Sequence, residues 1–168
     1  MNSSDIYWVK QVEPRRVAFG PRPRSGDWLS EEIDKWALRG IKHVASLLEA
    51  SEEYELGLTE ERKLCDARLI QFHALPIPDR GLPESTAEAR AFISKLAGFV
   101  EKGEPVYVHC RMGIGRSGII TGGILLHLGV RFDLVFQMLG AARGLSVPDT
   151  QAQVDWLKSF SQHLAGAL

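Results

Sequence analysis

The chain has 168 residues, of which 45% are hydrophobic and 24% are charged, and its formal net charge is −1. This length and composition are typical of one globular domain with a sizeable hydrophobic core. A charge close to zero argues against the strongly basic surface of a general nucleic-acid-binding protein. The longest apolar stretch, residues 119–130, contains Thr121 and His127 and is too short to span a bilayer.

The N-terminus and the two cysteines indicate a reducing environment. Residues 1–5 have neither a basic start nor an apolar core, so we expect no signal peptide. Cys65 and Cys110 make no disulfide framework, and no C-x-x-C pair predicts a zinc site. A free thiol persists in a reducing compartment, so we expect a cytoplasmic location. We also expect a monomer that needs no cofactor and no metal.

In the first half of the chain, short β-type runs alternate with helical patterns. Strands are predicted at 6–12 and 16–19, separated by a Glu-Pro turn signal. Apolar residues at helical spacing predict a helix over 28–39, and Gly40 stands where a C-terminal cap belongs. The next predicted elements are a strand at 41–48, a helix at 59–67 and a strand at 69–75.

A proline-rich loop at 76–83 leads into the second half of the chain. The pattern then predicts a long amphipathic helix over 84–101 and a buried strand over 106–109. Three closing helices are predicted at 116–128, 133–142 and 149–164. Alternating strands and helices predict an α/β fold, with residues 1–168 forming a single domain around a central, mostly parallel mixed sheet flanked by helices.

The most informative segment joins the buried strand to the next helix, where residues 105–118 read PVYVHCRMGIGRSG. Cys110 ends the strand, and Arg116 opens the helix six positions later. Backbone N–H groups that converge in such a loop, together with a helix N-terminus, bind phosphate. These positive surroundings lower the pKa of a cysteine thiol, and an arginine can grip two phosphate oxygens. The segment therefore predicts a phosphate-binding loop between a strand and a helix, with a cysteine nucleophile.

Two other interpretations of this segment are weaker. Residues 113–118 also match the dinucleotide-binding pattern G-x-G-x-x-G, and Asp133 follows at the required spacing. However, Asp133 begins a predicted helix, and too little chain follows it to complete a doubly wound sheet. The second interpretation makes Cys110 a buried core cysteine and Arg116 a surface residue. A Walker A loop and a nucleophile elbow are excluded, because the lysine of the first and the glycine spacing of the second are missing.

The pattern His-Cys-x5-Arg-Ser of residues 109–117 resembles the signature of the cysteine-dependent protein tyrosine phosphatases. Residues 76–83, PIPDRGLP, resemble the general-acid loop of the small atypical dual-specificity phosphatases. Residues 8–20 and 148–157 also resemble segments of that group, in the same order along the chain. The sequence has no Lys-Asn-Arg-Tyr segment like the phosphotyrosine-clamping loop of the larger tyrosine-specific enzymes. The resemblance therefore implies the dual-specificity branch, its phosphatase-like fold, and a catalytic domain over residues 1–168.

The resemblance also implies a reaction, the hydrolysis of phosphate monoesters through a cysteinyl-phosphate intermediate. Cys110 is the expected nucleophile, and Arg116 is expected to stabilise the transition state. Asp79 is expected to act first as general acid and then as general base, although most aspartates in Pro-Asp-x-Gly turns are simply solvated. The expected substrate-binding residues are Arg111, Met112, Gly113, Ile114, Gly115 and Arg116, through their backbone amides.

Other residues are expected to support these groups. Ser117 is expected to hydrogen-bond the cysteine sulfur, or else only to begin the helix. His109 would orient the loop through hydrogen bonds. Gln153 would position the hydrolytic water, but Gln151 competes for that role, and both are also compatible with a solvated helix surface. Cys65 is expected in the core rather than as a redox partner of Cys110, and a disulfide between the two would require Cα atoms within about 7 Å of each other.

Three functions remain open at this point. The first is a protein phosphatase that acts on a phosphoprotein or phosphopeptide, at phosphotyrosine and also at phosphoserine or phosphothreonine. The second keeps the chemistry for phosphoinositides, nucleotides or other small phosphate esters, which basic loop residues would favour, and only Arg111 qualifies. The third is a non-catalytic phosphate-binding module, which needs no nucleophile. We expect no nucleic-acid partner and no insertion into a membrane.

Overall fold

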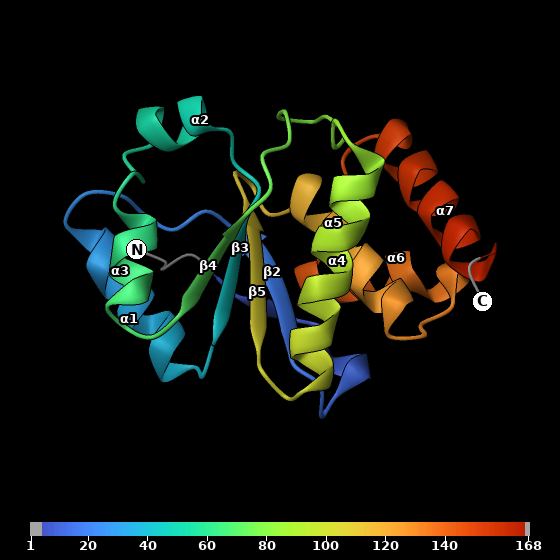
Figure 1. Ribbon diagram of the computed structural model, residues 1–168, viewed down its shortest axis with the longest axis horizontal. Helices are drawn as coiled ribbons and strands as arrows, with labels where there is room; N and C mark the ends of the chain where they lie inside the picture. Colours follow the sequence, from blue (N-terminus) through green and yellow to red (C-terminus); the bar gives the residue numbers. More distant parts are fainter. Residues whose placement is uncertain (1–4, 167–168) are drawn as a thin grey trace.

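The computed structural model describes residues 5–166, and five strands form one mixed sheet in this part of the chain, in the order β1-β2-β5-β3-β4 (Figure 1). The parallel strands are β2 (Val17–Pro21), β5 (Val106–Cys110), β3 (His43–Ser46) and β4 (Gln71–Ala74). Strand β1 (Tyr7–Trp8) pairs with β2 in the antiparallel sense. The predicted α/β fold with a mostly parallel mixed sheet is confirmed.

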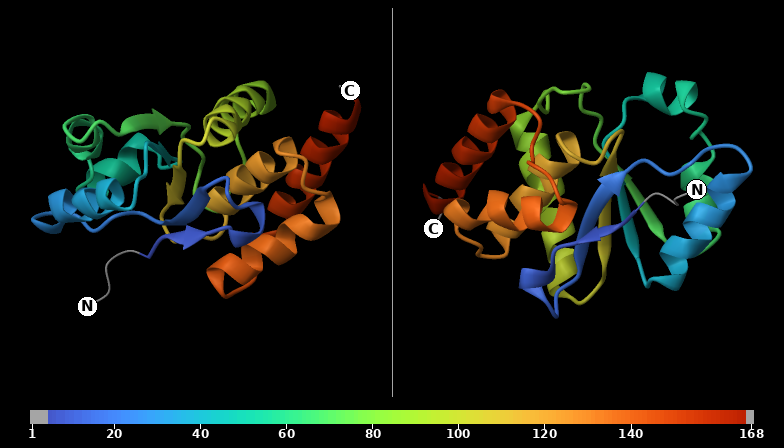
Figure 2. Two further views of the ribbon diagram at one scale, coloured as in Figure 1. Left: turned by 90° about the horizontal axis from the view of Figure 1, so that it is seen from below. Right: turned by 180° about the vertical axis from the view of Figure 1, so that it is seen from behind.

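Helices cover both faces of the sheet (Figures 1 and 2). On one face lie α1 (Trp28–Leu38) and α3 (Glu61–Asp66). On the other face lie α4 (Thr86–Glu101) and α5 (Arg116–His127), and α5 in turn contacts α6 (Phe132–Arg143) and α7 (Gln151–Gly166). In residues 5–166, no helix is both long enough and apolar enough to cross a membrane.

Strand β5 divides the hydrophobic core into two clusters. Val106, Val108 and Cys110 belong to the cluster beneath α4 and α5. Tyr107 belongs to the cluster beneath α1. His109 follows two residues later on the same side of the strand, and its ring lies 6.1 Å from the ring of Trp36 in α1. Because successive side chains of a strand point to opposite faces, the sheet directs the cysteine and the histidine of the motif into different halves of the core.

Most of the predicted elements are present with small shifts of their ends, and the glycine caps are confirmed. Gly40 and Gly103 follow α1 and α4 with φ angles of +82° and +83°, in the left-handed region that glycine adopts readily. Helix α4 begins after Ser85, whose hydroxyl accepts a hydrogen bond from the backbone N–H of Glu88 at 3.1 Å.

One predicted strand is wrong in its length, and one helix was not predicted. The predicted strand at 6–12 ends after Trp8, and Lys10–Val12 form a turn of 3-10 helix. Val9 and Val12 are both buried, and a spacing of three residues places two side chains on one side of a 3-10 turn. The helix α2 (Ala50–Glu55) was not predicted at all. The expectation about a signal peptide concerns residues 1–5, of which residues 1–4 lie outside the described residues.

Two histidines from neighbouring strands join the sheet to α4. In β3, the Nδ1 atom of His43 lies 3.1 Å from Nε2 of His73 in β4, and its Nε2 atom lies 2.8 Å from a carboxylate oxygen of Glu104. The His43 ring also stacks on Phe99, with centroids 3.7 Å apart. Because a carboxylate only accepts, Nε2 of His43 donates to Glu104, which leaves Nδ1 to accept the N–H of His73. Burial, with the nearby charge of Lys95, lowers the pKa of His73 from 6.5 to about 4.

We expect this histidine to destabilise the fold in acid. In the unfolded chain His73 takes up a proton near pH 6.5, and in the folded chain only near pH 4, so the unfolded state binds more protons between these values. The free energy of unfolding should therefore fall as the pH drops from 6.5 to 4, and His73→Gln should reduce that slope in urea titrations. His127→Gln, at an exposed position, is the control and should leave the slope unchanged. Equal slopes in the wild type and His73→Gln would contradict this account.

Candidate active site

Residues 111–115 form a tight loop between the carboxyl end of β5 and the start of α5. Gly113 has a φ of +73°, and a Cβ atom at this position would lie 2.2 Å from the carbonyl carbon of Gly20 and 2.4 Å from the nitrogen of Pro21. Both the backbone angle and the contact with β2 therefore require glycine. Arg143 of α6 donates hydrogen bonds to the carbonyl oxygens of Gly113 and Met112, at 3.0 and 3.2 Å, and so fixes the loop from its other side.

The loop brings Cys110 and Ser117 together, as predicted. The sulfur of Cys110 lies 3.2 Å from the hydroxyl oxygen of Ser117, the second residue of α5. Cys110 is buried at the end of β5. The alternative that makes Arg116 a surface residue is wrong, because this side chain is only 2% exposed.

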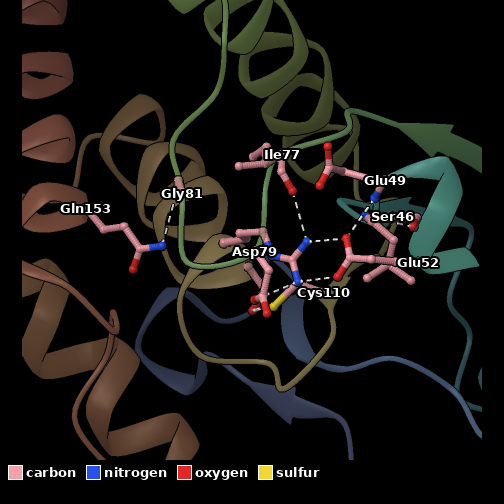
Figure 3. A network of polar contacts seen from close by, with 11 residues as sticks. Ser46, Glu49, Glu52, Ile77, Asp79, Gly81, Cys110 and Gln153 are labelled. Atoms are coloured by element: carbon pink, nitrogen blue, oxygen red, sulfur yellow. Dashed lines mark hydrogen bonds and ion pairs between the residues drawn. The ribbon is translucent and has the colours of Figure 1, made fainter. Parts of the chain in front are cut away.

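Arg116 is held by four hydrogen bonds from its two terminal nitrogens (Figure 3). Its Nη1 donates to Oε2 of Glu52 at 2.7 Å and to the carbonyl of Ile77 at 2.9 Å. Its Nη2 donates to Oε1 of Glu52 and to Oδ1 of Asp79, both at 3.0 Å. The pair with Glu52 is bidentate, and this geometry fixes the plane and direction of the guanidinium.

Glu52 is the acidic partner that the sequence did not reveal. It lies in the first turn of α2, and its Oε2 also accepts the backbone N–H of Glu49 at 2.9 Å, which ties the helix start to the site. Burial by itself raises the pKa of Glu52, but the hydrogen bonds from Arg116 and Glu49 and the charges of Arg116 and Arg111 bring it below its ordinary value. The carboxylate is therefore ionised where the guanidinium needs its charge.

The same contacts act on the arginine in the opposite direction. Burial disfavours the charged guanidinium, but the hydrogen bond and charge of Glu52 and the charges of Cys110 and Asp79 together raise the pKa of Arg116 above its ordinary value. The site thus keeps a permanent cation, already oriented, beside the cysteine sulfur.

Asp79 lies at the tip of the proline-rich loop. Its side chain is 55% exposed, although it reaches Arg116. The loop is fixed on both sides of this residue, because the N–H of Ile77 donates to the carbonyl of Leu47 at 3.1 Å and the N–H of Gly81 donates to the carbonyl of Pro78 at 2.8 Å. Figure 3 shows the Asp79 carboxylate and the Cys110 sulfur on the same side of the guanidinium. The structure therefore brings together the three residues predicted to do the chemistry.

His109 has a buried acidic partner as well. Its Nε2 lies 2.6 Å from Oε1 of Glu61 in α3, and both side chains are almost completely buried. His109 was predicted to orient the loop through hydrogen bonds, but its partner Glu61 was not predicted. Glutamates in the first turns of α2 and α3 resemble ordinary helix-start residues, so only their burial reveals their contacts.

The structure distinguishes the two candidate glutamines. Gln151 is exposed and donates to Asp155 of its own helix at 3.0 Å. Gln153 is fully buried, and its Oε1 accepts the N–H groups of Asp149 and Thr150 at 3.0 and 3.2 Å. Its Nε2 donates to the carbonyl of Gly81 at 3.2 Å, which links α7 to the loop that carries Asp79 (Figure 3).

Gln153 also lies against the phosphate-binding loop. A Cβ atom on Gly115 would stand 2.9 Å from Oε1 and 3.0 Å from Nε2 of Gln153. Because its Oε1 accepts the N–H groups of Asp149 and Thr150 just before α7 and its Nε2 donates to Gly81, Gln153 connects the phosphate-binding loop, the start of α7 and the loop that carries Asp79.

The remaining predicted residues differ in their environments. Met112 is 63% exposed, whereas Arg111 is partly buried and close enough for its charge to act on Glu52. Cys65 lies in the core cluster beneath α1, and Cys110 lies in the cluster on the other face of the sheet, with both thiols free. Within residues 5–166, no group of three or more histidine, cysteine or acidic side chains is arranged to hold a metal ion.

Comparison with known proteins agrees with this geometry. The model of the family described as "Swiss Army Knife protein, DSP-PTPase phosphatase domain" matches residues 7–160. A protein of Invertebrate iridescent virus 6, 197R, which carries the name of a tyrosine phosphatase, is 33% identical over 151 residues, or 83% of this chain and 54% of the relative. The chain thus spans about half the length of this viral relative.

Two solved structures share the fold. Kinase associated phosphatase with serine in place of its catalytic site cysteine has a TM-score of 0.87 and 20% identity, covering 100% of this chain and 99% of that one. PTPMT1 in complex with PI(5)P has a TM-score of 0.72 and 20% identity, covering 90% of this chain and 93% of that one. The resemblance found in the sequence is confirmed, and the chain belongs to the PTP-SAK family of dual-specificity phosphatase domains.

Proposed function

We propose that this chain hydrolyses phosphate monoesters on proteins, at phosphotyrosine and also at phosphoserine or phosphothreonine, through a cysteinyl-phosphate intermediate. The main support is the guanidinium of Arg116, which hydrogen-bonds both Glu52 and Asp79 beside the cysteine. The family and the shared fold support phosphatase chemistry. We propose a catalytic domain over residues 1–168.

In the first step, the thiolate of Cys110 attacks phosphorus, and the sulfur–phosphorus bond forms as the bond to the leaving oxygen breaks. Arg116 and the amides of residues 111–116 hold the three equatorial oxygens. The incoming phosphate competes with Asp79 for Nη2 of Arg116, so substrate binding releases the Asp79 carboxyl group. In its protonated form this carboxyl group donates a proton to the leaving oxygen.

In the second step, the Asp79 carboxylate takes a proton from water, and the resulting nucleophile attacks phosphorus. The bond between sulfur and phosphorus breaks, which releases inorganic phosphate and restores the thiolate. The Ser117 hydroxyl, 3.2 Å from the sulfur, can donate a hydrogen bond to the departing thiolate. No step requires a metal or a cofactor.

Other properties follow from this mechanism. All the groups that it uses come from one chain, which supports a catalytic monomer. A nucleophilic thiol survives in a reducing compartment, which supports a cytoplasmic location. A phosphoinositide or another small phosphate ester is the second candidate substrate. In its favour are the fold shared with a PI(5)P-bound phosphatase and Arg111, whose charge acts on Glu52 inside the site.

The test is hydrolysis of phosphopeptides and an aryl phosphate by purified protein in the presence of a chelator. We expect activity with chelator present, and no turnover by Cys110→Ser, which lacks the thiolate. Cys65→Ser is the matched control and should remain active, because Cys65 lies on the other face of the sheet. Activity that survives in Cys110→Ser, or that requires a divalent metal, would contradict the mechanism. Phosphoinositides in the same panel compare the two substrate classes.

Asp79→Asn should slow the reaction in proportion to the need for a proton on the leaving group. For phenyl phosphate we expect a loss of about 10²–10⁴ in kcat, the range typical of general acid catalysis. For dinitrophenyl phosphate the loss should be much smaller, because this leaving group departs without a proton. An equal loss for both substrates, in steady-state assays at one pH, would exclude Asp79 as the acid.

Glu52→Gln should weaken both the fold and the catalysis, because it leaves the buried guanidinium of Arg116 without its counter-charge. Removing one partner of a buried ion pair costs about 3–5 kcal/mol. Urea unfolding measures this loss, and kcat/KM should fall with it. Glu53→Gln, on the same helix, is the matched control and should leave kcat/KM near the wild-type value. Equal kcat/KM values for the two variants would show that Glu52 does not orient Arg116.

A further inference from the structure

A groove of about 510 Å³ lies between α4 and α7, outside the site described above. Figures 1 and 2 show the start of α7 beside the start of α4, at the end of the molecule where the Asp79 loop enters α4. This volume is in the range of small-molecule binding sites. The lining residues are Leu82, Thr86, Arg90, Ala152, Asp155, Trp156, Ser159, Phe160 and His163.

One wall of the groove is aromatic. The rings of Trp156 and Phe160, one helical turn apart in α7, lie 5.6 Å apart with an angle of 15° between their planes. Ala152 precedes them at the same spacing, so these side chains form one stripe along the helix. Such a surface favours a flat or branched apolar group.

The opposite wall carries an unpaired cation. The Nε atom of Arg90 in α4 is buried and has no hydrogen-bond partner among the described residues. Asp155 also lines the groove, but among the described residues no ion pair joins it to Arg90, and its Oδ1 accepts a hydrogen bond from Gln151 at 3.0 Å. Because the Nε atom is enclosed, a ligand in the groove would bind the terminal nitrogens of the guanidinium, where an anion supplies both a hydrogen-bond acceptor and the opposite charge.

We propose that this groove binds a compact organic anion, namely an aromatic or branched aliphatic carboxylate, with its carboxylate on Arg90 and its apolar body against Trp156 and Phe160. The groove lies outside the phosphate-binding loop and takes a ligand of a different class from the phosphate ester. Its effect on turnover, described next, rests on the proposed function, whereas the binding itself does not.

The groove is connected to the Asp79 loop by one residue. Leu82 lines the groove, and its neighbour Gly81 accepts the hydrogen bond from Gln153 and donates to Pro78 across the turn that contains Asp79. A ligand that packs on Leu82 holds this turn in the position where Asp79 reaches Arg116. The incoming phosphate has to displace Asp79 from Arg116, so the bound ligand opposes the step that needs a proton from Asp79, and turnover of phenyl phosphate should fall relative to dinitrophenyl phosphate.

The binding test uses calorimetric titration of the full chain with 1-naphthaleneacetate and with its neutral analogue 1-naphthaleneacetamide. We expect one molecule of the carboxylate per chain and a Kd about tenfold below that of the amide, equal to about 1.4 kcal/mol. Arg90→Met should remove this preference. Lys158→Met, at an exposed position of α7 outside the groove, should keep it. Equal binding of the two ligands to the wild type would overturn the proposal.

Two further measurements locate the ligand, and the ratio of turnover rates tests the coupling to Asp79. Thr86→Trp narrows the groove from its exposed rim and should weaken both ligands. Saturating vanadate occupies the phosphate-binding loop and should not displace the carboxylate, whereas displacement would place the ligand in that loop and overturn the proposal. A chain without phosphatase activity would contradict the proposed function but would still give the titration. If the carboxylate binds and the ratio of the two turnover rates stays constant, the coupling to Asp79 is wrong.

Discussion

A guanidinium that is only 2% exposed is costly unless an ionised partner accompanies it, and Glu52 meets that need for Arg116. The pair constrains much of the surrounding structure. Glu52 has to remain charged, so it takes a position at the start of α2, where a backbone N–H adds a second hydrogen bond. The arginine in turn keeps one orientation and reaches both the Ile77 carbonyl and the loop that carries Asp79. The cation that a phosphate requires is therefore in place before any phosphate binds.

Three other helices make similar contacts with the phosphate-binding loop or with the residues next to it. Glu61 of α3 bonds the histidine that precedes the cysteine, and Arg143 of α6 bonds two loop carbonyls. Gln153 of α7 lies against Gly115 and bonds Gly81. All but the exposed bond from Arg143 to Met112 are buried or partly buried, and each contact joins segments that are far apart in the sequence. Since the reacting groups sit on a loop, this shell of side chains supplies the rigidity that a loop does not have by itself.

The sequence correctly predicted those features that depend on residues close together in the chain. The strand, the loop and the helix around Cys110 are all specified within fourteen residues, residues 105–118, and they were predicted correctly in type and order. Contacts such as that of Arg116 with Glu52, 64 positions away, depend on how the helices pack, and no local pattern contains that information. Helix α2 has six residues and little apolar periodicity, so its signal was too weak to predict. The choice between Gln151 and Gln153 needed the exact rotation of α7, because residues two apart lie on different sides of a helix.

The alternation of side chains along β5 has a consequence for the folding chain. His109 belongs with the half of the core beneath α1 and α3, and Cys110 belongs with the half beneath α4 and α5. A partly folded chain that has formed one half of the core therefore contains the cysteine without the complete set of groups around it. Its thiol would be an ordinary cysteine, without an oriented cation beside it. The nucleophile that the proposed reaction needs therefore exists only once both halves of the core have formed together.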